Sequence, residues 1–234
     1  MLQNGRIHYT QAQAGYRTGL EPVLLAAAIP ARPGERVVEA GCGAGAGLLC
    51  LVARVTGLQA LGLEIDPPTA ALARANLAAN AHTNATVLVQ DVTCWQPDMP
   101  YDHAFANPPW HRPDGTPSPN PDRKRAKQAA PGLLRAWATA LGAGLRRRGT
   151  LSFILPAASL TEGMTALTAA RCPEIALFPF WPRDREPARL IILQGTRDGA
   201  GVSRVHPGLI LHTETGSFTE KADSLLRYGA ALGT

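Results

Sequence analysis

Short apolar runs alternate with alanine- and leucine-rich stretches along most of this chain, and the alternation limits the folds open to it. Five runs read as strands, at residues 36–40, 58–64, 86–90, 103–107 and 150–156. The stretches between them read as helices, at residues 46–55, 67–81, 133–145 and 157–170. Nearly continuous apolar strands that alternate with helices are typical of a parallel sheet covered on both faces.

The last two long strands depart from this alternation. Residues 174–180 and 188–195 are joined by only Trp-Pro-Arg-Asp-Arg-Glu-Pro, which is too short for a parallel crossover. We therefore expect a doubly wound α/β fold, a mostly parallel sheet of seven strands with an antiparallel last strand. A further short strand is expected at 209–212 and a helix at 220–232.

The chain is expected to form a single domain over residues 1–234. Its core would be residues 36–195, with an N-terminal segment at 1–35 and a C-terminal strand and helix within 196–234. Residues 21–29 read as a helix that would lie over the mouth of a site.

Composition excludes several classes of protein. The hydrophobic fraction is 45%, and no apolar run reaches the roughly 20 residues that span a bilayer. The N-terminus has no secretory pattern. The four cysteines form no CxxC pair, and the six histidines are scattered, so no metal site is indicated. We expect a cytoplasmic protein without a metal; the sequence gives no indication of the oligomeric state.

Positive charge is concentrated in one segment. Between His111 and Arg148 there are nine Lys or Arg against two acids, which gives +7 in a chain whose net charge is +5. Such a segment attracts polyanions, because each phosphate that is neutralised releases a counterion. A solvated loop and helix face is the alternative. Our candidate RNA contacts are Arg112, Arg123, Lys124, Arg125, Lys127, Arg146, Arg147 and Arg148.

A glycine-rich loop follows the first strand and opens the next helix. It reads Glu39-Ala40-Gly41-Cys42-Gly43-Ala44-Gly45, so Gly41, Gly43 and Gly45 lie at alternate positions. In open α/β sheets, ligands bind at the carboxyl ends of the strands, where glycines allow the backbone to approach them. The position between a strand and a helix predicts a nucleotide-type cofactor site.

Three acids at successive strand ends favour one kind of cofactor. Glu64 lies nineteen residues after Gly45 and can accept hydrogen bonds from ribose hydroxyls. Asp91 can accept from an adenine amino group beside the Val92 N–H, although a helix cap is an equal reading for Asp91. Together with Glu39, these acids would repel a pyrophosphate and suit S-adenosylmethionine, which carries a sulfonium and an amino group.

The tetrapeptide Asn107-Pro108-Pro109-Trp110 follows a strand at the place expected for an active-site loop. A planar amine is a poor nucleophile because its lone pair is delocalised. The Asn107 side-chain oxygen and the Pro108 carbonyl can align its hydrogens, so that the lone pair points at a methyl donor. Trp110 offers a face on which a base can stack. The alternative is a proline-rich turn with a buried tryptophan.

At these residues the chain resembles the class I S-adenosylmethionine-dependent methyltransferases that modify amino groups, which have a Rossmann-like fold. Within that group it most resembles the bacterial tRNA(Val) adenine-N6 methyltransferases, also through residues 13–25 and 209–232. The resemblance implies N6-methylation of an adenine in a tRNA anticodon loop, with Thr18 and Gly19 at the methionine end of the cofactor. Trp110 departs from the commoner Tyr or Phe.

Other functions remain open at this point. Guanine-N2 methylation of ribosomal RNA and glutamine methylation of a protein would keep the same chemistry. The second usually needs an N-terminal helical domain, for which about thirty residues before the core are too few. A nicotinamide-dependent oxidoreductase would fit the glycines and Glu64 but not the tetrapeptide, and a catalytically silent RNA-binding module would fit the fold.

Overall fold

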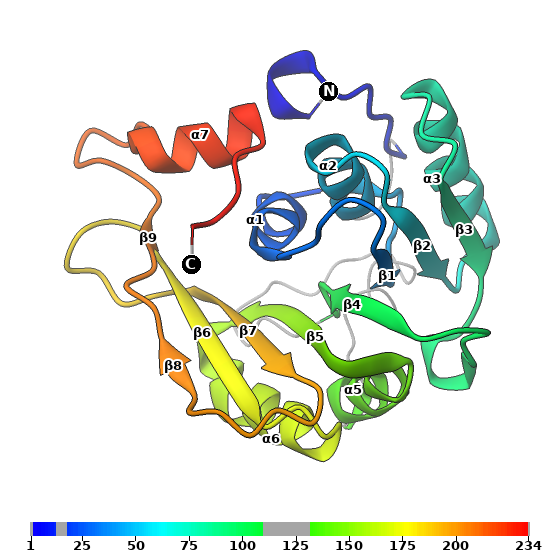
Figure 1. Ribbon diagram of the computed structural model, residues 1–234. Coiled ribbons are helices and arrows are strands. Elements are labelled where there is room, and N and C mark those ends of the chain that lie inside the picture. Colours follow the sequence, from blue (N-terminus) through cyan, green and yellow to red (C-terminus); the bar gives the residue numbers. More distant parts are fainter. Residues whose placement is uncertain (1, 13–17, 110–131, 234) are drawn as a thin grey trace, which may run out of the picture.

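The computed structural model describes residues 2–12, 18–109 and 132–233 of the chain. These residues form one central sheet between two layers of helices (Figure 1). The long strands are β1 (Arg36–Ala40), β2 (Gln59–Glu64), β3 (Ala85–Val89), β4 (Tyr101–Ala106), β5 (Leu145–Pro156), β6 (Glu174–Trp181) and β7 (Leu190–Thr196). Their order in the sheet is β3-β2-β1-β4-β5-β7-β6.

The sheet is mostly parallel, as the alternation of strands and helices predicts. β7 is the antiparallel strand and lies between β5 and β6, because its short link to β6 allows only a hairpin. Two strands of two residues, β8 (Arg204–Val205) and β9 (Leu209–Ile210), pair with β6 and extend the expected seven. They form because the chain after β7 runs back along the free edge of β6.

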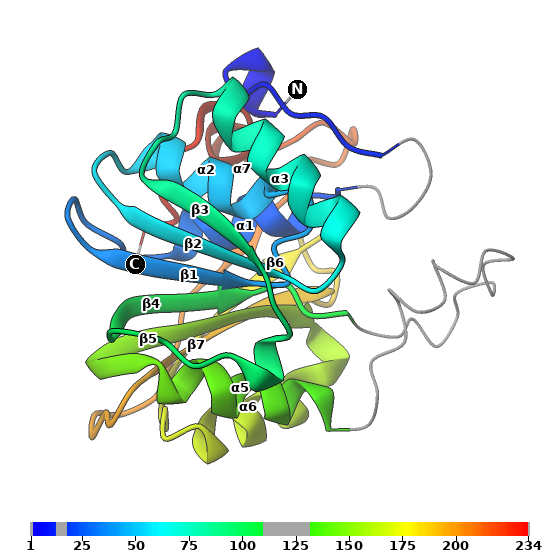
Figure 2. The ribbon, with the colours of Figure 1, turned by 90° about the vertical axis from the view of Figure 1, so that its right-hand side faces the viewer.

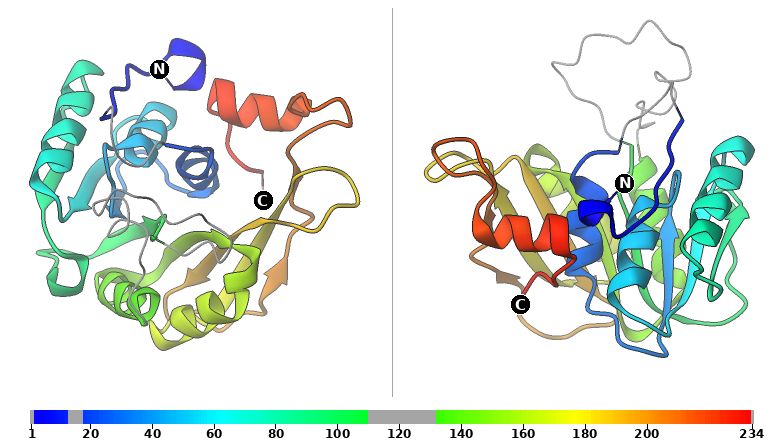
Figure 3. Two further views of the ribbon diagram at one scale, coloured as in Figure 1. Left: turned by 180° about the vertical axis from the view of Figure 1, so that it is seen from behind. Right: turned by 90° about the horizontal axis from the view of Figure 1, so that it is seen from above.

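Helices cover both faces of the sheet (Figures 2 and 3). One layer holds α1 (Glu21–Ala28), α2 (Ala46–Arg54), α3 (Pro67–Ala79) and α7 (Glu220–Tyr228), and the other holds α5 (Leu133–Ala143) and α6 (Leu160–Ala169). Neighbouring residues of β1 show the two-sided burial, since Val37 packs with the first layer and Val38 with the second, both fully buried. Single-turn helices occur at η1 (Gln3–Gly5), η2 (Val92–Cys94) and η3 (Ala157–Ser159).

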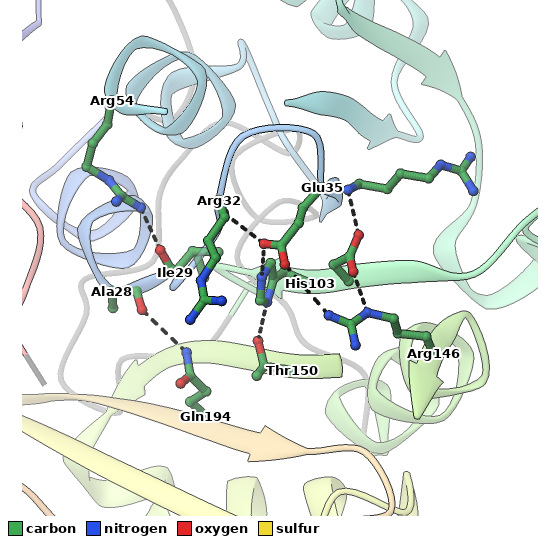
Figure 4. Close-up of polar contacts among 11 residues, drawn as sticks. Ala28, Ile29, Arg32, Glu35, Arg54, His103, Arg146, Thr150 and Gln194 are labelled. Atoms are coloured by element: carbon green, nitrogen blue, oxygen red, sulfur yellow. Dashed lines mark hydrogen bonds and ion pairs between the residues drawn. The ribbon is translucent and has the colours of Figure 1, made fainter. Parts of the chain in front are cut away.

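The first helix belongs to the core. Every residue of α1 from 22 to 28 is buried, and the helix packs against α2 and β5; that it lies over the mouth of a site stays a prediction. A helix that is apolar all round has no face to offer to water. Arg54 of α2 donates to the carbonyl of Ile29 (Figure 4) and to that of Ala26, and so caps the C-terminal end of α1.

The arginine cluster at residues 146–148 lies in a strand and does not end a helix. α5 stops at Ala143, and β5 begins at Leu145, so the three arginines form the amino-terminal part of β5. Among the helices that the structure describes, none is long and apolar enough to cross a membrane.

Candidate cofactor and target site

The glycine loop and Asn107 meet at the carboxyl edge of the sheet. Ala40 at the end of β1 is paired with Ala106 at the end of β4. Gly41 and Asn107 follow these two residues directly, on parallel strands about 4.8 Å apart. Strand order runs outward in opposite directions from β1 and β4, so this is the topological switch point where α/β folds bind ligands. Figure 2 shows this edge where β4 ends.

The three loop glycines all have positive φ, of 61° at Gly41, 56° at Gly43 and 88° at Gly45. Their surroundings differ. A Cβ on Gly41 would lie 2.7 Å from Cη2 of Trp137, whereas a Cβ on Gly43 would meet no atom of the described residues within 4 Å. The open space beside Gly43 is where a ligand can approach the backbone, and the Gly43 N–H is held by Glu64 Oε2 at 2.9 Å.

Alanine at these two positions is expected to have separable effects. Gly41→Ala should lower the free energy of unfolding by about 2–4 kcal/mol, since it adds a steric clash with Trp137 to the conformational cost. Gly43→Ala carries only the conformational cost of about 1–2 kcal/mol, but its methyl group enters the open space and should weaken S-adenosylhomocysteine binding. Urea unfolding and calorimetric titration measure the two effects; equal stability losses and unchanged binding in Gly43→Ala would contradict this.

Glu39 is a buried carboxyl group with an unused oxygen. It is 3% exposed, its Oε2 has no hydrogen-bond partner among the described residues, and the main chain of Leu48 in the first turn of α2 donates to the carboxyl group. The lack of a side chain at Gly47 leaves room for Oε1. Burial raises the pKa of Glu39 to about 8, with a smaller contribution from the charge of Glu64. A cationic group beside Oε2 would satisfy this oxygen.

Glu64 and Asp91 already hold backbone groups. Glu64 accepts from Gly43 N through one oxygen and from Asp66 N, at 3.0 Å, through the other. Each carboxylate oxygen keeps a second lone pair, so a ribose hydroxyl can still bind. Asp91 Oδ1 caps η2 by accepting from the main chain and hydroxyl of Thr93, both at 2.8 Å. Asp91 therefore acts as a helix cap, as the alternative interpretation predicted, and its Oδ2 remains for an adenine amino group. Val92 is buried in η2.

The part of the tetrapeptide that the structure describes lies at this edge. Asn107 and Pro109 are half-buried and Pro108 is buried. Among the described residues, no hydrogen bond engages the side chain of Asn107, so its amide is available to a target group. Trp110 lies outside the described residues. Thr18 is half-buried, and its hydroxyl is 2.7 Å from the Tyr9 hydroxyl, while Gly19 is exposed beside the Glu21 carboxyl.

These residues fit S-adenosylmethionine. An unpaired buried carboxyl oxygen at Glu39 suits an ammonium group, the space at Gly43 admits a ligand, and Glu64 can hold hydroxyls. The three acids do not suit a pyrophosphate. Within the described residues no cluster of His, Cys, Asp or Glu is arranged to hold a metal.

Only three of the predicted basic residues are among the described residues, and these three lie away from this site. Arg112, Arg123, Lys124, Arg125 and Lys127 lie outside the described residues. Arg146, Arg147 and Arg148 are exposed at the amino-terminal end of β5, on the opposite edge of the sheet.

Two of these arginines are engaged by acids. Arg146 pairs with Asp102 and with Glu35 (Figure 4). Arg148 pairs with Glu174 at 2.8 Å. A strand of twelve residues separates its two ends by about 35 Å, so these arginines lie far from the carboxyl end of β5, and their contact with RNA stays a prediction.

Two aromatic or polar residues of the site were not predicted. Trp137 of α5 packs over Gly41, and Asn76 of α3 is 3% exposed and donates to the Ala44 carbonyl of the glycine loop at 2.9 Å. An asparagine in the interior of an alanine-rich helix is an unfavourable choice for helix stability, and this was the signal that could have found it.

A groove of about 840 Å³ opens farther along the same edge, between the β6–β7 link and the segment around β9. Its lining includes Trp181, Arg183 and Lys221 and no residue of the glycine loop or of the tetrapeptide. β5 and β7 separate β6 from β4. We therefore place the cofactor at the glycine loop and not in this groove.

Comparison with known proteins agrees with the class of protein that fold and site define. A family model described as methyltransferase small domain matches residues 21–120. A predicted O-methyltransferase from Agrobacterium tumefaciens has the same fold, with a TM-score of 0.76 at 24% identity over 92% of this chain and 99% of its own. A precorrin-6y C5,15-methyltransferase from Geobacter metallireducens follows with a TM-score of 0.58 at 13% identity, covering 81% and 94% of the two chains. The chain has the fold of the class I methyltransferases and is an S-adenosylmethionine-dependent methyltransferase.

Two relatives are similar along most of the sequence. The tRNA1(Val) (adenine(37)-N6)-methyltransferase of Aeromonas hydrophila is 24% identical over 219 residues, which cover 92% of this chain and 91% of the relative. The enzyme of the same name from Vibrio campbellii is 23% identical over 214 residues, which cover 87% and 84% of the two chains.

Proposed function

We propose that this methyltransferase transfers a methyl group to N6 of an adenine in tRNA, in the anticodon loop. The observation that carries the proposal is the placement of Asn107 beside the glycine loop, with its amide unengaged among the described residues. The relatives from Aeromonas and Vibrio, which are named for this reaction, support the choice of target. An anticodon loop presents unpaired bases, so exposing the target costs little.

Each residue of the site has a proposed part in this reaction. The cofactor would be held by Glu39, Gly41, Gly43, Gly45, Glu64, Asp91 and Val92, with Thr18 and Gly19 at its methionine end, and Asn107 would also contact it. Bound S-adenosylmethionine supplies the methyl group as an electrophile. The Asn107 oxygen and the Pro108 carbonyl would accept the two amine hydrogens, and Pro109 and Trp110 would complete the wall on which the base stacks. No general base is required, because the nitrogen loses its proton after attack.

The test is incubation with labelled S-adenosylmethionine and bulk tRNA, followed by nucleoside analysis. N6-methyladenosine in the tRNA is the expected product. N2-methylguanosine after incubation with ribosomal RNA, or label in protein, would replace the proposed target with one of the two same-chemistry rivals. Absence of transfer to any of them, with S-adenosylhomocysteine still bound, would leave the catalytically silent module as the function.

The basic segment provides a second, independent test. Arg123→Glu with Arg125→Glu should weaken tRNA binding and reduce the slope of log Kd against log salt by about 1.5–2, because two phosphate contacts are lost. Arg32→Glu with Arg147→Glu is the matched control, since both residues are exposed at the amino-terminal edge of the sheet. Equal slopes in the two variants would remove Arg112, Arg123, Lys124, Arg125 and Lys127 from the proposed RNA surface.

We propose a cytoplasmic location, which agrees with four unpaired cysteines.

A further inference from the structure

Residues 8–10 of the N-terminal segment are held against α3 by the side chains of two asparagines. These side chains pair with main-chain N–H and C=O groups, as a neighbouring strand would. Asn80 Oδ1 accepts from His8 N at 2.9 Å, and Asn80 Nδ2 donates to His8 O at 2.7 Å. Asn76 repeats the pattern with Thr10, at 2.9 Å to its N–H and 2.8 Å to its carbonyl. Both main-chain groups of each residue are thus paired with one side-chain amide.

The spacing of the two asparagines explains the match. Asn76 and Asn80 are four residues apart in the helical ladder, which places them about 6 Å apart along the axis on one face. His8 and Thr10 are two residues apart in an extended chain, about 6.6 Å. The spacing of the two asparagines thus matches the spacing of His8 and Thr10, so both side-chain amides can pair with the extended segment at once. The Asn80 side chain makes one more hydrogen bond, from its Nδ2 to the main-chain carbonyl of Asn76 at 2.8 Å, and this bond orients the Asn80 amide.

This pairing connects the segment to the glycine loop. The Asn76 Nδ2 that binds Thr10 also donates to Ala44 O, so one buried amide joins residue 10 to the loop that holds the cofactor. Tyr9, between the two paired residues, packs against the core on the α1–α2 side of the sheet. Its hydroxyl lies 2.7 Å from Thr18 Oγ1, and Gln11 Oε1 accepts from Thr18 N at 3.0 Å.

The charge of the buried acid Glu39 also acts on Tyr9. Burial raises the pKa of the Tyr9 hydroxyl, the bond with Thr18 lowers it, and the charge of Glu39 raises it again. The hydroxyl is therefore within electrostatic range of the carboxyl group that has an unpaired oxygen.

We infer that Asn76 and Asn80 are positioning residues that hold residues 8–10 as a wall of the cofactor site, with the Tyr9 hydroxyl and Thr18 directed at the methionine end of the cofactor. The inference rests on the proposed cofactor site at the glycine loop and is independent of the RNA target.

Asn80→Ala and Tyr9→Phe test it without touching the glycine loop. Each is expected to weaken S-adenosylhomocysteine binding, measured by calorimetry, about three- to tenfold, the range for one or two net hydrogen bonds. Asn80→Asp keeps the acceptor for His8 N and should fall between Asn80→Ala and the wild type. Hydrogen exchange at the amides of residues 8 and 10 should be faster in Asn80→Ala only, and bound S-adenosylhomocysteine should slow it in the wild type.

The matched control is Ala75→Gly, an exposed position of α3. This substitution lowers the stability of α3, because glycine is a poorer helix former than alanine. It leaves the hydrogen bonds of Asn76 and Asn80 intact, so the dissociation constant for S-adenosylhomocysteine should equal that of the wild type. Dissociation constants within twofold of wild type in both Asn80→Ala and Tyr9→Phe would overturn the inference. Failure of the wild-type protein to bind S-adenosylhomocysteine would instead refute the proposed cofactor site.

Discussion

Asn107→Ala is expected to lower kcat for methyl transfer to tRNA by about 10²–10³, the effect of removing one preorganised acceptor from an active site. Binding of S-adenosylhomocysteine should stay within twofold of wild type, because Asn107 follows β4 whereas the glycine loop follows β1. Single-turnover kinetics with labelled cofactor and a separate binding titration measure the two quantities.

The reason for the loss is geometric. Without the Asn107 oxygen, only the Pro108 carbonyl can align the amine, and the nitrogen lone pair is no longer directed at the methyl group. Asn107→Asp keeps an acceptor oxygen and should retain more activity than Asn107→Ala. An increase in KM with kcat unchanged would show that Asn107 contributes equally to substrate and transition state, and the proposed role would fail.

Glu39→Gln is expected to remove the loss of stability that Glu39 causes as pH rises in the free protein. The pKa of Glu39 is raised from 4.5 to about 8, so between these values the folded protein holds a proton that the unfolded chain releases. Stability is therefore fully present below pH 4.5 and is lost as pH rises toward 8, by about 3 kcal/mol at pH 7. Glutamine stays neutral and removes this loss.

Urea unfolding from pH 5 to pH 8 checks this expectation. The variant should gain on the wild type as pH rises, whereas Glu162→Gln, at an exposed position of α6, should follow the wild-type curve. Parallel curves for Glu39→Gln and wild type would show that the carboxyl group is ionised in the fold at no cost.

Cofactor binding should show the opposite trend. An ammonium group beside Oε2 favours the carboxylate, so binding releases a proton, and affinity for S-adenosylhomocysteine should rise with pH up to about 8. Titrations in two buffers of different ionisation enthalpy detect the proton. In Glu39→Gln the proton release and the pH dependence should both disappear, and binding should be weaker.

Local patterns determined the strands, the helices and the order of the site motifs. The apolar runs predicted β1 to β7, although β5 begins at Leu145 and not at residue 150 as expected, and the short link after residue 180 predicted the antiparallel hairpin of β6 and β7. The position of the glycines between a strand and a helix, and of Asn107 after a strand, was enough to place both at the carboxyl edge, because parallel strands share that edge.

Relations between distant segments were decided only by the tertiary structure. The charge of residues 146–148 is visible in the sequence, but whether it joins the site depends on which end of β5 carries it and on the partners Asp102, Glu35 and Glu174. The burial of Glu39, with its raised pKa, and the pairing of Asn76 and Asn80 with residues 8–10 likewise arise from packing across the fold. Hydrophobic periodicity reports which face of an element is covered, whereas these contacts depend on what covers it, and a local pattern does not contain that information.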